Sequence, residues 1–193
     1  MKFRKAAAMA VSLLCVVALQ GCAGVTATGA AIGGVAAQDR RTPGTLVDDE
    51  YIELKVLAAI NKDDTMASQT HVNVTSFNGL VLLTGEAPGK SLRDRITEIT
   101  RSTPGVLAVQ NEIGLLAPST LVARTNDTLV TGKVKLALLR GMEISSARVK
   151  VVTERGAVYL MGLLRQDEAD RATGIARRVP GVQRVVKVIE YIE

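Results

Sequence analysis

The sequence predicts an α+β protein built from two tandem units, each with the element order helix, strand, strand, helix, strand. Two observations lead to this prediction: the second half of the chain repeats the pattern of the first, and each half holds two alternating apolar runs joined at a glycine turn. A strand–helix–strand connection is expected to be right-handed. Each unit should therefore form a small three-stranded mixed sheet that packs on two helices.

The repeat consists of four blocks that occur in the same order in both halves. Residues 77–85 (FNGLVLLTG) correspond to residues 154–162 (ERGAVYLMG), 77 positions later. The other blocks are Val72-Asn73-Val74 with Val149-Lys150-Val151, Pro104-Gly105-Val106 with Pro180-Gly181-Val182, and Asp49, Ile52, Val56 and Ile60 with Asp127, Val130, Val134 and Leu138. Offsets that drift by one residue between blocks are expected from loop insertions. We interpret the pattern as a duplicated folding unit.

The first unit is expected to open with a helix that Asp48 or Asp49 caps, because carboxylates accept hydrogen bonds from the free amides of a first turn. Asn78-Gly79 predicts a hairpin turn, since both residues tolerate positive φ. Pro104 predicts the end of the second helix. The expected elements are helices at residues 48–60 and 91–102 and strands at residues 71–75, 80–84 and 106–115.

The second unit is expected to repeat these elements. Its opening helix, NDTLVTGKVKLALLRG, has Asn126 or Asp127 as the candidate N-cap and Gly141 as its end. The expected elements are helices at residues 126–141 and 167–179 and strands at residues 148–153, 157–161 and 182–191.

The opening helix of the second unit has two apolar faces. The face that would dock on a core consists of Val130, Val134 and Leu138. The second face carries Leu129, Lys133, Lys135, Leu136 and Arg140. A surplus apolar face edged with positive charge suits an interfacial membrane contact or the groove of a partner. The alternative is that a loop or the other unit covers this face.

The N-terminus has the order of a secretory signal. Lys2, Arg4 and Lys5 precede an apolar run over residues 6–19, which is too short to span a membrane. Residues 1–21 are therefore expected to be removed as a signal peptide. Since three of the positive charges lie there, the mature chain would have a net charge of +2 instead of +5.

The residues that follow the apolar run, Leu19-Gln20-Gly21-Cys22, resemble the lipobox of bacterial lipoproteins. In that class the cysteine becomes the acylated first residue of the mature chain, so the resemblance implies lipidation at Cys22. Ala23 in the next position implies sorting to the outer membrane, facing the periplasm. The alternative is an ordinary signal peptide followed by a chance cysteine. With Cys15 removed and Cys22 acylated, no disulfide is expected.

The rest of the chain divides by composition. A stretch rich in Gly, Ala and Thr shows neither helical nor strand periodicity, which predicts a flexible tether between the lipid and the first unit. The expected divisions are a lipidated tether at residues 22–47, a first domain at residues 48–116, a linker at residues 117–125 and a second domain at residues 126–193.

Several of these residues carry a resemblance to the BON domain family: the glycine of each hairpin, Gly85 or Gly162, and the Pro-Gly-Val before each last strand. Two such units behind a lipobox resemble the dual BON-domain outer-membrane lipoproteins. The resemblance covers nearly all of residues 47–193 and implies the αββαβ fold predicted above. It also implies a phospholipid contact on the opening helix of the second domain, at Leu129, Lys133, Leu136 and their neighbours.

No catalytic, cofactor or metal site is expected. His71 is the only histidine and has no free cysteine beside it, the paired carboxylates precede helices or lie in polar loops, and the glycines lie in hairpins instead of a phosphate loop. Nucleic acid is an unsuitable partner because tryptophan is absent and only 3% of the residues are aromatic. A hydrolase or metalloprotein stays as the weakest alternative.

The charge is divided unevenly between the units. Residues 22–118 have a net charge of −3 and residues 119–193 a net charge of +5. The sequence therefore predicts a lipid-anchored periplasmic protein whose second domain binds anionic phospholipid and supports outer-membrane integrity. The resemblance suggests phosphatidylglycerol or cardiolipin as the lipid and division sites as one location. The alternative function is a protein-binding adaptor for the outer-membrane assembly machinery.

Overall fold

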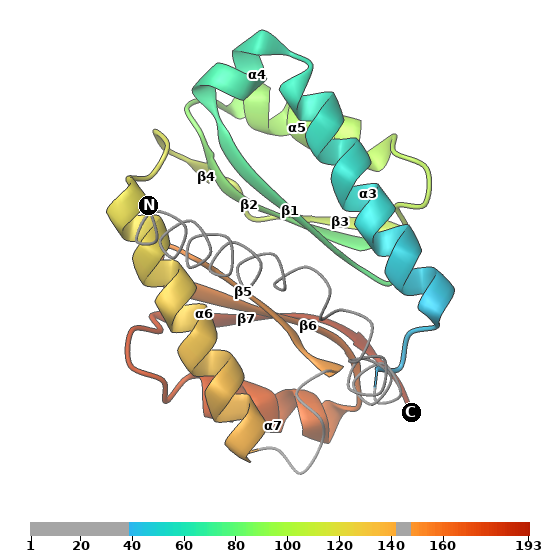
Figure 1. Ribbon diagram of the computed structural model, residues 1–193, viewed down its shortest axis with the longest axis vertical. Helices are drawn as coiled ribbons and strands as arrows, with labels where there is room; N and C mark the ends of the chain where they lie inside the picture. Colours follow the sequence, from blue (N-terminus) through green and yellow to red (C-terminus); the bar gives the residue numbers. More distant parts are fainter. Residues whose placement is uncertain (1–38, 142–147) are drawn as a thin grey trace, which may run out of the picture. The chain divides into compact units, whose positions relative to one another are not determined.

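The computed structural model describes residues 39–141 and 148–193, which form one compact body that contains both repeated units (Figure 1). The predicted signal peptide, Cys22 and most of the predicted tether lie outside the described residues. Within the described ranges, no helix is long and apolar enough to cross a membrane.

The predicted α+β fold is confirmed. The first unit contains α3 (Pro43–Asn61), α4 (Asp64–Gln69), β1 (His71–Phe77), β2 (Leu80–Ala87), α5 (Lys90–Arg101), β3 (Ala108–Asn111) and β4 (Gly114–Leu115). The second unit contains α6 (Leu121–Gly141), β5 (Lys150–Glu154), β6 (Ala157–Leu164), α7 (Gln166–Ala176) and β7 (Arg184–Tyr191). In each unit the two hairpin strands are antiparallel. The strands β3 and β4 after α5 run parallel to β2, and β7 after α7 runs parallel to β6.

The first unit departs from the predicted pattern at two places. Its last strand is divided into β3 and β4, and both segments pair with β2. The loop expected around Asp63-Asp64 contains the short helix α4, because Oδ1 of Asp63 accepts hydrogen bonds from the amides of Thr65 and Met66.

The predicted caps of the two opening helices are wrong. Helix α3 begins at Pro43, inside the predicted tether, where Thr42 is the N-cap and proline occupies a position that needs no amide donor. Helix α6 begins at Leu121, and the amide of Ala123 donates to the Thr120 hydroxyl at 3.3 Å. The carboxylates that were expected to cap these helices lie inside them.

Asp49 is buried in α3 and binds the hairpin turn of its own unit. Its carboxylate accepts hydrogen bonds from the amides of Asn78 at 2.8 Å and Gly79 at 2.9 Å, from the Ser76 hydroxyl at 2.6 Å and from Arg41 at 2.9 Å. Burial acts to raise the pKa of Asp49, but these hydrogen bonds outweigh it and hold the pKa below its ordinary value. The turn has positive φ at both central residues, and the carboxylate satisfies amides that no strand pairs.

Asp127 plays the same role in α6. Its carboxylate accepts from the amides of Arg155 at 2.7 Å and Gly156 at 2.9 Å, and these two residues also have positive φ. The duplicated aspartate is therefore a device that fixes the hairpin to the opening helix in each unit. It does not cap the helix.

Each unit has its own apolar core between its sheet and its helices. The first core includes Ile52, Val56, Ile60, Met66, Val74, Val81, Leu83 and Ile96. The second includes Val130, Val134, Leu138, Val149, Val151, Val158, Leu160 and Ala172. The predicted core stripes of both opening helices are therefore confirmed.

The two sheets face each other through a third apolar cluster. It consists of Phe77, Leu82, Ala157, Tyr159, Met161 and Val188. Since side chains alternate between the two faces of a strand, β2 supplies Leu83 to its own core and Leu82 to this cluster. The described residues thus form four layers, helices, sheet, sheet and helices, as Figure 1 shows.

Opposite charges of the two units meet at this interface. The pairs are Lys150 with Glu53 at 2.8 Å, Arg155 with Glu86 at 3.2 Å and Arg184 with Glu112 at 3.4 Å. In each pair the second unit contributes the cation and the first unit the carboxylate. Part of the charge difference between the units is therefore neutralised inside the molecule, and only the remaining charges are available to other molecules.

The residues before α3 contact both units. Arg40 donates to both carboxylate oxygens of Glu168 in α7, at 2.5 and 2.9 Å. Arg41 donates to Asp49 and lies over the Phe77 ring, 3.8 Å from its centroid. The chain therefore enters the described unit at the junction of its two halves.

Candidate membrane-binding surface

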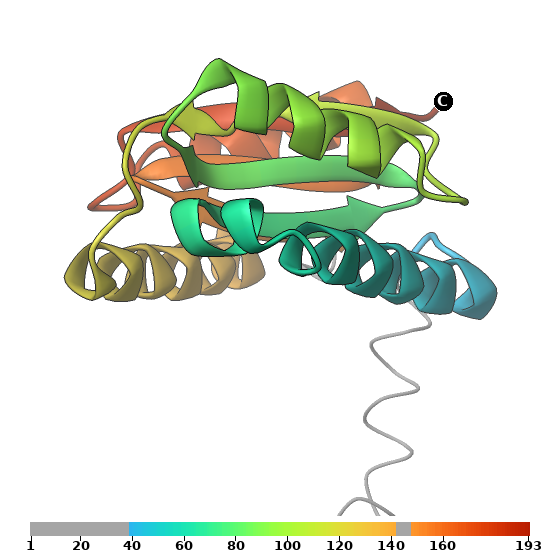
Figure 2. The ribbon, with the colours of Figure 1, turned by 90° about the horizontal axis from the view of Figure 1, so that it is seen from above.

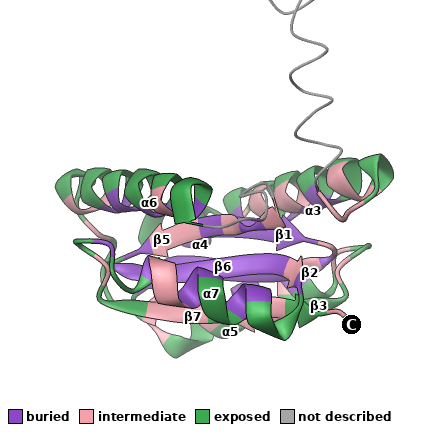
Figure 3. Ribbon diagram, turned by 90° about the horizontal axis from the view of Figure 1, so that it is seen from below, coloured by how far each residue is buried: buried purple, intermediate pink, exposed green. Residues whose placement is uncertain are grey.

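The outward face of α6 carries all five residues that the sequence predicts as the phospholipid contact. Leu129 is 59% exposed and Leu136 is 45% exposed. Lys133, Lys135 and Arg140 are also exposed. The opposite side of the helix, with Val130, Val134 and Leu138, is buried on the second core, so the exposed residues point away from that core. Figure 3 shows this exposed side along the length of α6.

More apolar residues lie on the exposed part of α6 than the sequence analysis identified. Leu139 is 62% exposed, and Leu121 and Val122 in the first turn are 77% and 80% exposed. These residues were missed because the helix was expected to begin at Asn126 and because Leu139 is adjacent to the core residue Leu138. Exposed apolar residues therefore occur in both the first and the last turn of α6.

The positive side chains of this region have no carboxylate partners. Among the residues that the structure describes, no carboxylate lies within ion-pair distance of Lys133, Lys135 or Arg140. The same is true of Arg177 and Arg178, which follow α7 and were not predicted. The sequence shows these two arginines as an adjacent positive pair, but only the fold shows that they follow α7 at the side of α6.

Three of these cations border one groove between α6 and the end of α7. The groove has a volume of about 420 Å³, and its lining is Lys133, Leu136, Ala137, Arg140, Ile175, Arg178, Val179 and Pro180. The structure thus brings together three of the predicted residues, Lys133, Leu136 and Arg140. Leu129 and Lys135 lie on α6 outside the groove. An apolar floor with a cationic rim is complementary to a lipid that carries a negative head group.

The opening helix of the first unit, α3, lies along the same edge of the two packed sheets as α6, and Figure 2 shows the two helices in one row. Its outward face is also apolar, with Val47 68% exposed, Tyr51 54% exposed and Leu54 65% exposed. Asp48 and Glu50 are exposed beside this stripe. The outward surface of α3 is therefore apolar and acidic, whereas that of α6 is apolar and basic.

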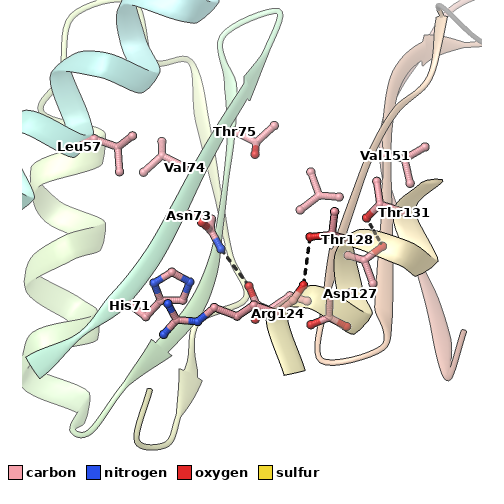
Figure 4. Close-up of a pocket in the computed structure, with 13 residues that line it drawn as sticks. Leu57, His71, Asn73, Val74, Thr75, Arg124, Asp127, Thr128, Thr131 and Val151 are labelled. Carbon is pink, nitrogen blue, oxygen red and sulfur yellow. Dashed lines mark hydrogen bonds between the residues drawn. The ribbon is translucent and has the colours of Figure 1, made fainter. Parts of the chain in front are cut away.

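A second pocket lies between the two units and has a different character (Figure 4). It has a volume of about 510 Å³ and is bordered by α3, β1, α6 and β5, with His71, Asn73, Arg124, Thr128 and Glu154 among its polar residues. Burial lowers the pKa of His71, and the positive charge of Arg124 lowers it further. Burial and the charge of Glu86 raise the pKa of Glu154.

The polar groups of this pocket mainly bind each other or the backbone. Asn73 donates to Glu154 at 3.1 Å, and Thr131 donates to Thr153 at 2.7 Å. The Arg124 guanidinium donates to the Ser119 carbonyl at 2.9 Å. Of these three bonds only the one between Asn73 and Glu154 joins the two units, and no nucleophile and base are paired among them. Across residues 39–141 and 148–193, no cluster of three metal-binding side chains occurs.

Comparison with known proteins agrees with the fold. The BON domain family matches residues 48–116 and residues 126–193. The outer membrane lipoprotein DolP of Haemophilus influenzae is 34% identical over 185 residues, which cover 96% of each chain. The 21 kDa hemolysin of Actinobacillus pleuropneumoniae is 37% identical over 80% of each chain.

A more distant relative has the same domain. The osmotically inducible protein Y of Escherichia coli is 30% identical over 74% of this chain and 72% of its own length. The two family matches coincide with the two units described above, and the match to the lipoprotein also extends beyond them toward the N-terminus. The chain therefore belongs to the BON domain family, as a protein with two BON domains that is anchored by lipid in the outer membrane.

Proposed function

We propose that this protein binds anionic phospholipid through the outward face of α6 in its second BON domain and thereby supports outer-membrane integrity, including at division sites. The observation that supports the proposal most directly is the combination of exposed leucines with unpaired positive side chains on one helix. A helix of this kind lies in the interfacial plane of a membrane, with its apolar side chains below the head groups.

The energies are sufficient for a protein that a lipid already holds at the membrane. A Lys or Arg near an anionic leaflet contributes about 1 kcal/mol, so Lys133, Lys135 and Arg140 together contribute roughly 3 kcal/mol. Burial of Leu129 and Leu136 adds about 25 cal/mol for each Å² removed from water. In our proposal an acylated Cys22, facing the periplasm, keeps the domain close to the leaflet, so this modest contact is occupied.

The test is co-sedimentation with vesicles of phosphatidylglycerol or cardiolipin against vesicles of phosphatidylcholine. The protein is the chain from residue 22 with Cys22→Ser, so that only the protein surface can bind. We expect the unsubstituted surface to bind anionic vesicles and to lose this binding as salt is added. The double substitution Leu129→Glu with Leu136→Glu should abolish it.

The matched control is Leu107→Glu, since Leu107 is 79% exposed and lies in the first domain away from α6. It should leave vesicle binding unchanged. Binding that persists in the Leu129→Glu, Leu136→Glu variant, or that is equally strong on phosphatidylcholine, would disprove the proposal.

The acidic face of α3 favours a second function for the first domain. Val47, Tyr51 and Leu54 form an exposed apolar stripe, and the carboxylates beside it would be repelled by an anionic leaflet. We propose that this stripe binds a protein of the outer-membrane assembly machinery through a basic, apolar segment. Photo-crosslinkers placed at Tyr51 and at Leu129 in cells should yield protein adducts from the first position and lipid adducts from the second. Lipid adducts at both positions would refute this second function.

A further inference from the structure

The groove between α6 and α7 has features that a flat membrane-binding face does not need. Its two walls come from separate elements, because Lys133, Leu136 and Arg140 lie on α6 while Arg178 and Val179 follow α7. A flat bilayer contact needs only the outward residues of one helix. A groove with a second wall can enclose part of a single molecule.

The walls are held close together at the end of α6. A side chain at Gly141 would place its Cβ 3.0 Å from Cδ1 of Ile175, tighter than ordinary van der Waals contact. Glycine therefore lets the last turn of α6 pack against α7. Ile175 is half-buried and Val179 is buried at the floor, so the floor of the groove is apolar and fixed by the core.

The cations of the rim surround this floor from both walls. Lys133 and Arg140 are two turns apart on α6, with Leu136 between them, and Arg178 is on the facing wall. All three side chains are unpaired among the described residues. Arginine binds a phosphate through two parallel hydrogen bonds, and lysine adds a point charge. The rim is thus complementary to one phosphodiester, and the floor is complementary to the first part of an acyl chain.

The first domain lacks this constellation although it has the same fold. The repeat places Lys55, Ala58 and Lys62 at the positions of Lys133, Leu136 and Arg140, and Ser102 at the position of Arg178. Lys55 lies over the Tyr51 ring, 4.3 Å from its centroid. The facing-wall cation and the central leucine therefore belong to the second domain alone, and the BON fold does not require them.

We infer that this groove is a stoichiometric site for one anionic phospholipid, with Lys133, Arg140 and Arg178 on its phosphate and the apolar floor against its acyl chain. The inference rests on the proposed function and adds a defined site to it. The flat face of α6 would attach the domain to the leaflet, while the groove would select lipids that carry a net negative head group.

The test uses a lipid that forms no bilayer: dihexanoyl phosphatidylglycerol below its critical micelle concentration, titrated calorimetrically into the Cys22→Ser chain. We expect saturable binding of one lipid per chain. Arg178→Ala should weaken it about tenfold or more, as expected for loss of a charge-assisted phosphate contact. Arg177→Ala is the matched control, since it removes the same charge from the adjacent exposed residue outside the groove, and it should change the affinity less than about twofold.

Three further titrations decide the identity of the ligand. Dihexanoyl phosphatidylcholine should bind at least about tenfold more weakly, because it has no net charge for the unpaired rim to neutralise. Inorganic phosphate and glycerol phosphate should bind weakly, because they lack an acyl chain. Equal affinity for phosphate alone, or equal losses in Arg177→Ala and Arg178→Ala, would overturn the inference in favour of diffuse electrostatics.

The failures of the site and of the proposed function are distinguishable. If vesicles bind but the single lipid does not, the groove is no lipid site and the α6 contact stands. If the single lipid binds but vesicles do not, the membrane-docking function fails and the groove stands. Each variant is checked by urea denaturation, and because Arg178 is exposed and unpaired among the described residues, its removal should leave the urea midpoint unchanged.

Discussion

The two BON domains have the same fold, but their opening helices differ on the side that faces away from the fold. Inside, the correspondence is close: Ile52, Val56 and Ile60 in α3 match Val130, Val134 and Leu138 in α6 as buried residues. Outside, the residues Asp48, Glu50, Tyr51, Leu54 and Ala58 of α3 stand where α6 has Asn126, Thr128, Leu129, Gly132 and Leu136. Both outer faces are partly apolar, yet only α3 has carboxylates beside its stripe.

The difference indicates which positions the duplicated fold needs and which are free to change. Asp49 and Asp127 are kept because each satisfies the turn amides of its own hairpin. The outward positions make no contact that the fold requires. They have diverged into one acidic and one basic surface, which is the pattern expected when two copies of a domain take different partners.

The largest effect should come from a buried charge that only the second domain has. The third residue of α7 is Glu168, with no exposed surface, whereas the third residue of α5 is Leu92. The hydrogen bond from Arg40 lowers the pKa of Glu168 from 4.5 to about 2, against the opposing effect of burial. Glu168→Gln should cost on the order of 3 kcal/mol of unfolding free energy at neutral pH.

The pH dependence of this loss has a defined sign. A carboxylate with a lowered pKa stabilises the folded state fully above its unfolded pKa of 4.5, and this contribution disappears as the pH falls to about 2. Urea denaturation at several pH values should therefore show the unsubstituted chain and Glu168→Gln converging in acid. Asp167→Asn, at a neighbouring and exposed residue, is the control. A gap that stays constant with pH would contradict the assignment.

The two turn aspartates should differ in their effect on stability. Asp49 accepts hydrogen bonds from four groups and Asp127 from two backbone amides. Each buried donor left without a partner costs about 1–3 kcal/mol, but water can replace the partner at the part-buried donors. Asp49→Ala should therefore lose roughly 2–3 kcal/mol and Asp127→Ala roughly 1–2 kcal/mol. Urea denaturation measures both, with the exposed Asp48→Ala as control. Equal losses would mean that Arg41 and Ser76 contribute nothing.

The ion pairs between the domains should have a smaller effect. Arg155 binds Glu86, whose side chain has no exposed surface, but Arg155 itself is 47% exposed. Arg155→Ala should therefore lower the free energy of unfolding by only about 1–2 kcal/mol, because water around the exposed guanidinium screens its charge. Lys90→Ala removes an exposed pair within the first domain, with Asp94, and should have a much smaller effect because solvent screens both charges. A loss in Arg155→Ala no larger than in Lys90→Ala would show that the domains associate through apolar contacts alone.

Local patterns predicted the fold well because its signals lie close together in the sequence. The alternation around Asn78-Gly79 and the stripe of Val130 and Val134 are set by neighbouring residues, and both were confirmed. The role of Asp49 could not be predicted in this way. A carboxylate before an apolar run has the signature of a helix cap, and only the tertiary fold shows that it reaches a turn about thirty residues away.

The surface was predicted in part for the same reason. Helical periodicity predicted that Leu129 and Leu136 lie off the core stripe, and both are exposed. Arg178 was missed because it is far from α6 in the sequence, and only the fold brings it close to that helix. The charge difference between the domains was counted correctly, but composition does not reveal that Lys150 and Glu53 neutralise each other across the interface.

The smallest effect tests whether the acidic residues of α3 alone keep it from the membrane. Asp48→Asn with Glu50→Thr gives α3 the residues that α6 has at these positions, while its apolar stripe stays unchanged. Each carboxylate opposes binding to an anionic leaflet by at most about 1 kcal/mol, and less when it lies at the edge of the contact face, as both do here. Their removal should therefore raise the affinity for phosphatidylglycerol vesicles about two- to fivefold.

The control is Asp94→Asn with Glu98→Gln, which removes the same net charge from two exposed residues of α5. Figure 3 shows α5 at the opposite edge of the molecule from α3 and α6, so its charge lies away from a leaflet that α6 contacts. Vesicle co-sedimentation of this control should match the unsubstituted chain. An equal rise in both double variants would mean that net charge governs binding, and the contrast between the two opening helices would then have no role in choosing the membrane. A rise in the α3 variant alone would show that the two domains differ in membrane affinity because of where their charges lie, since both already have an outward apolar stripe.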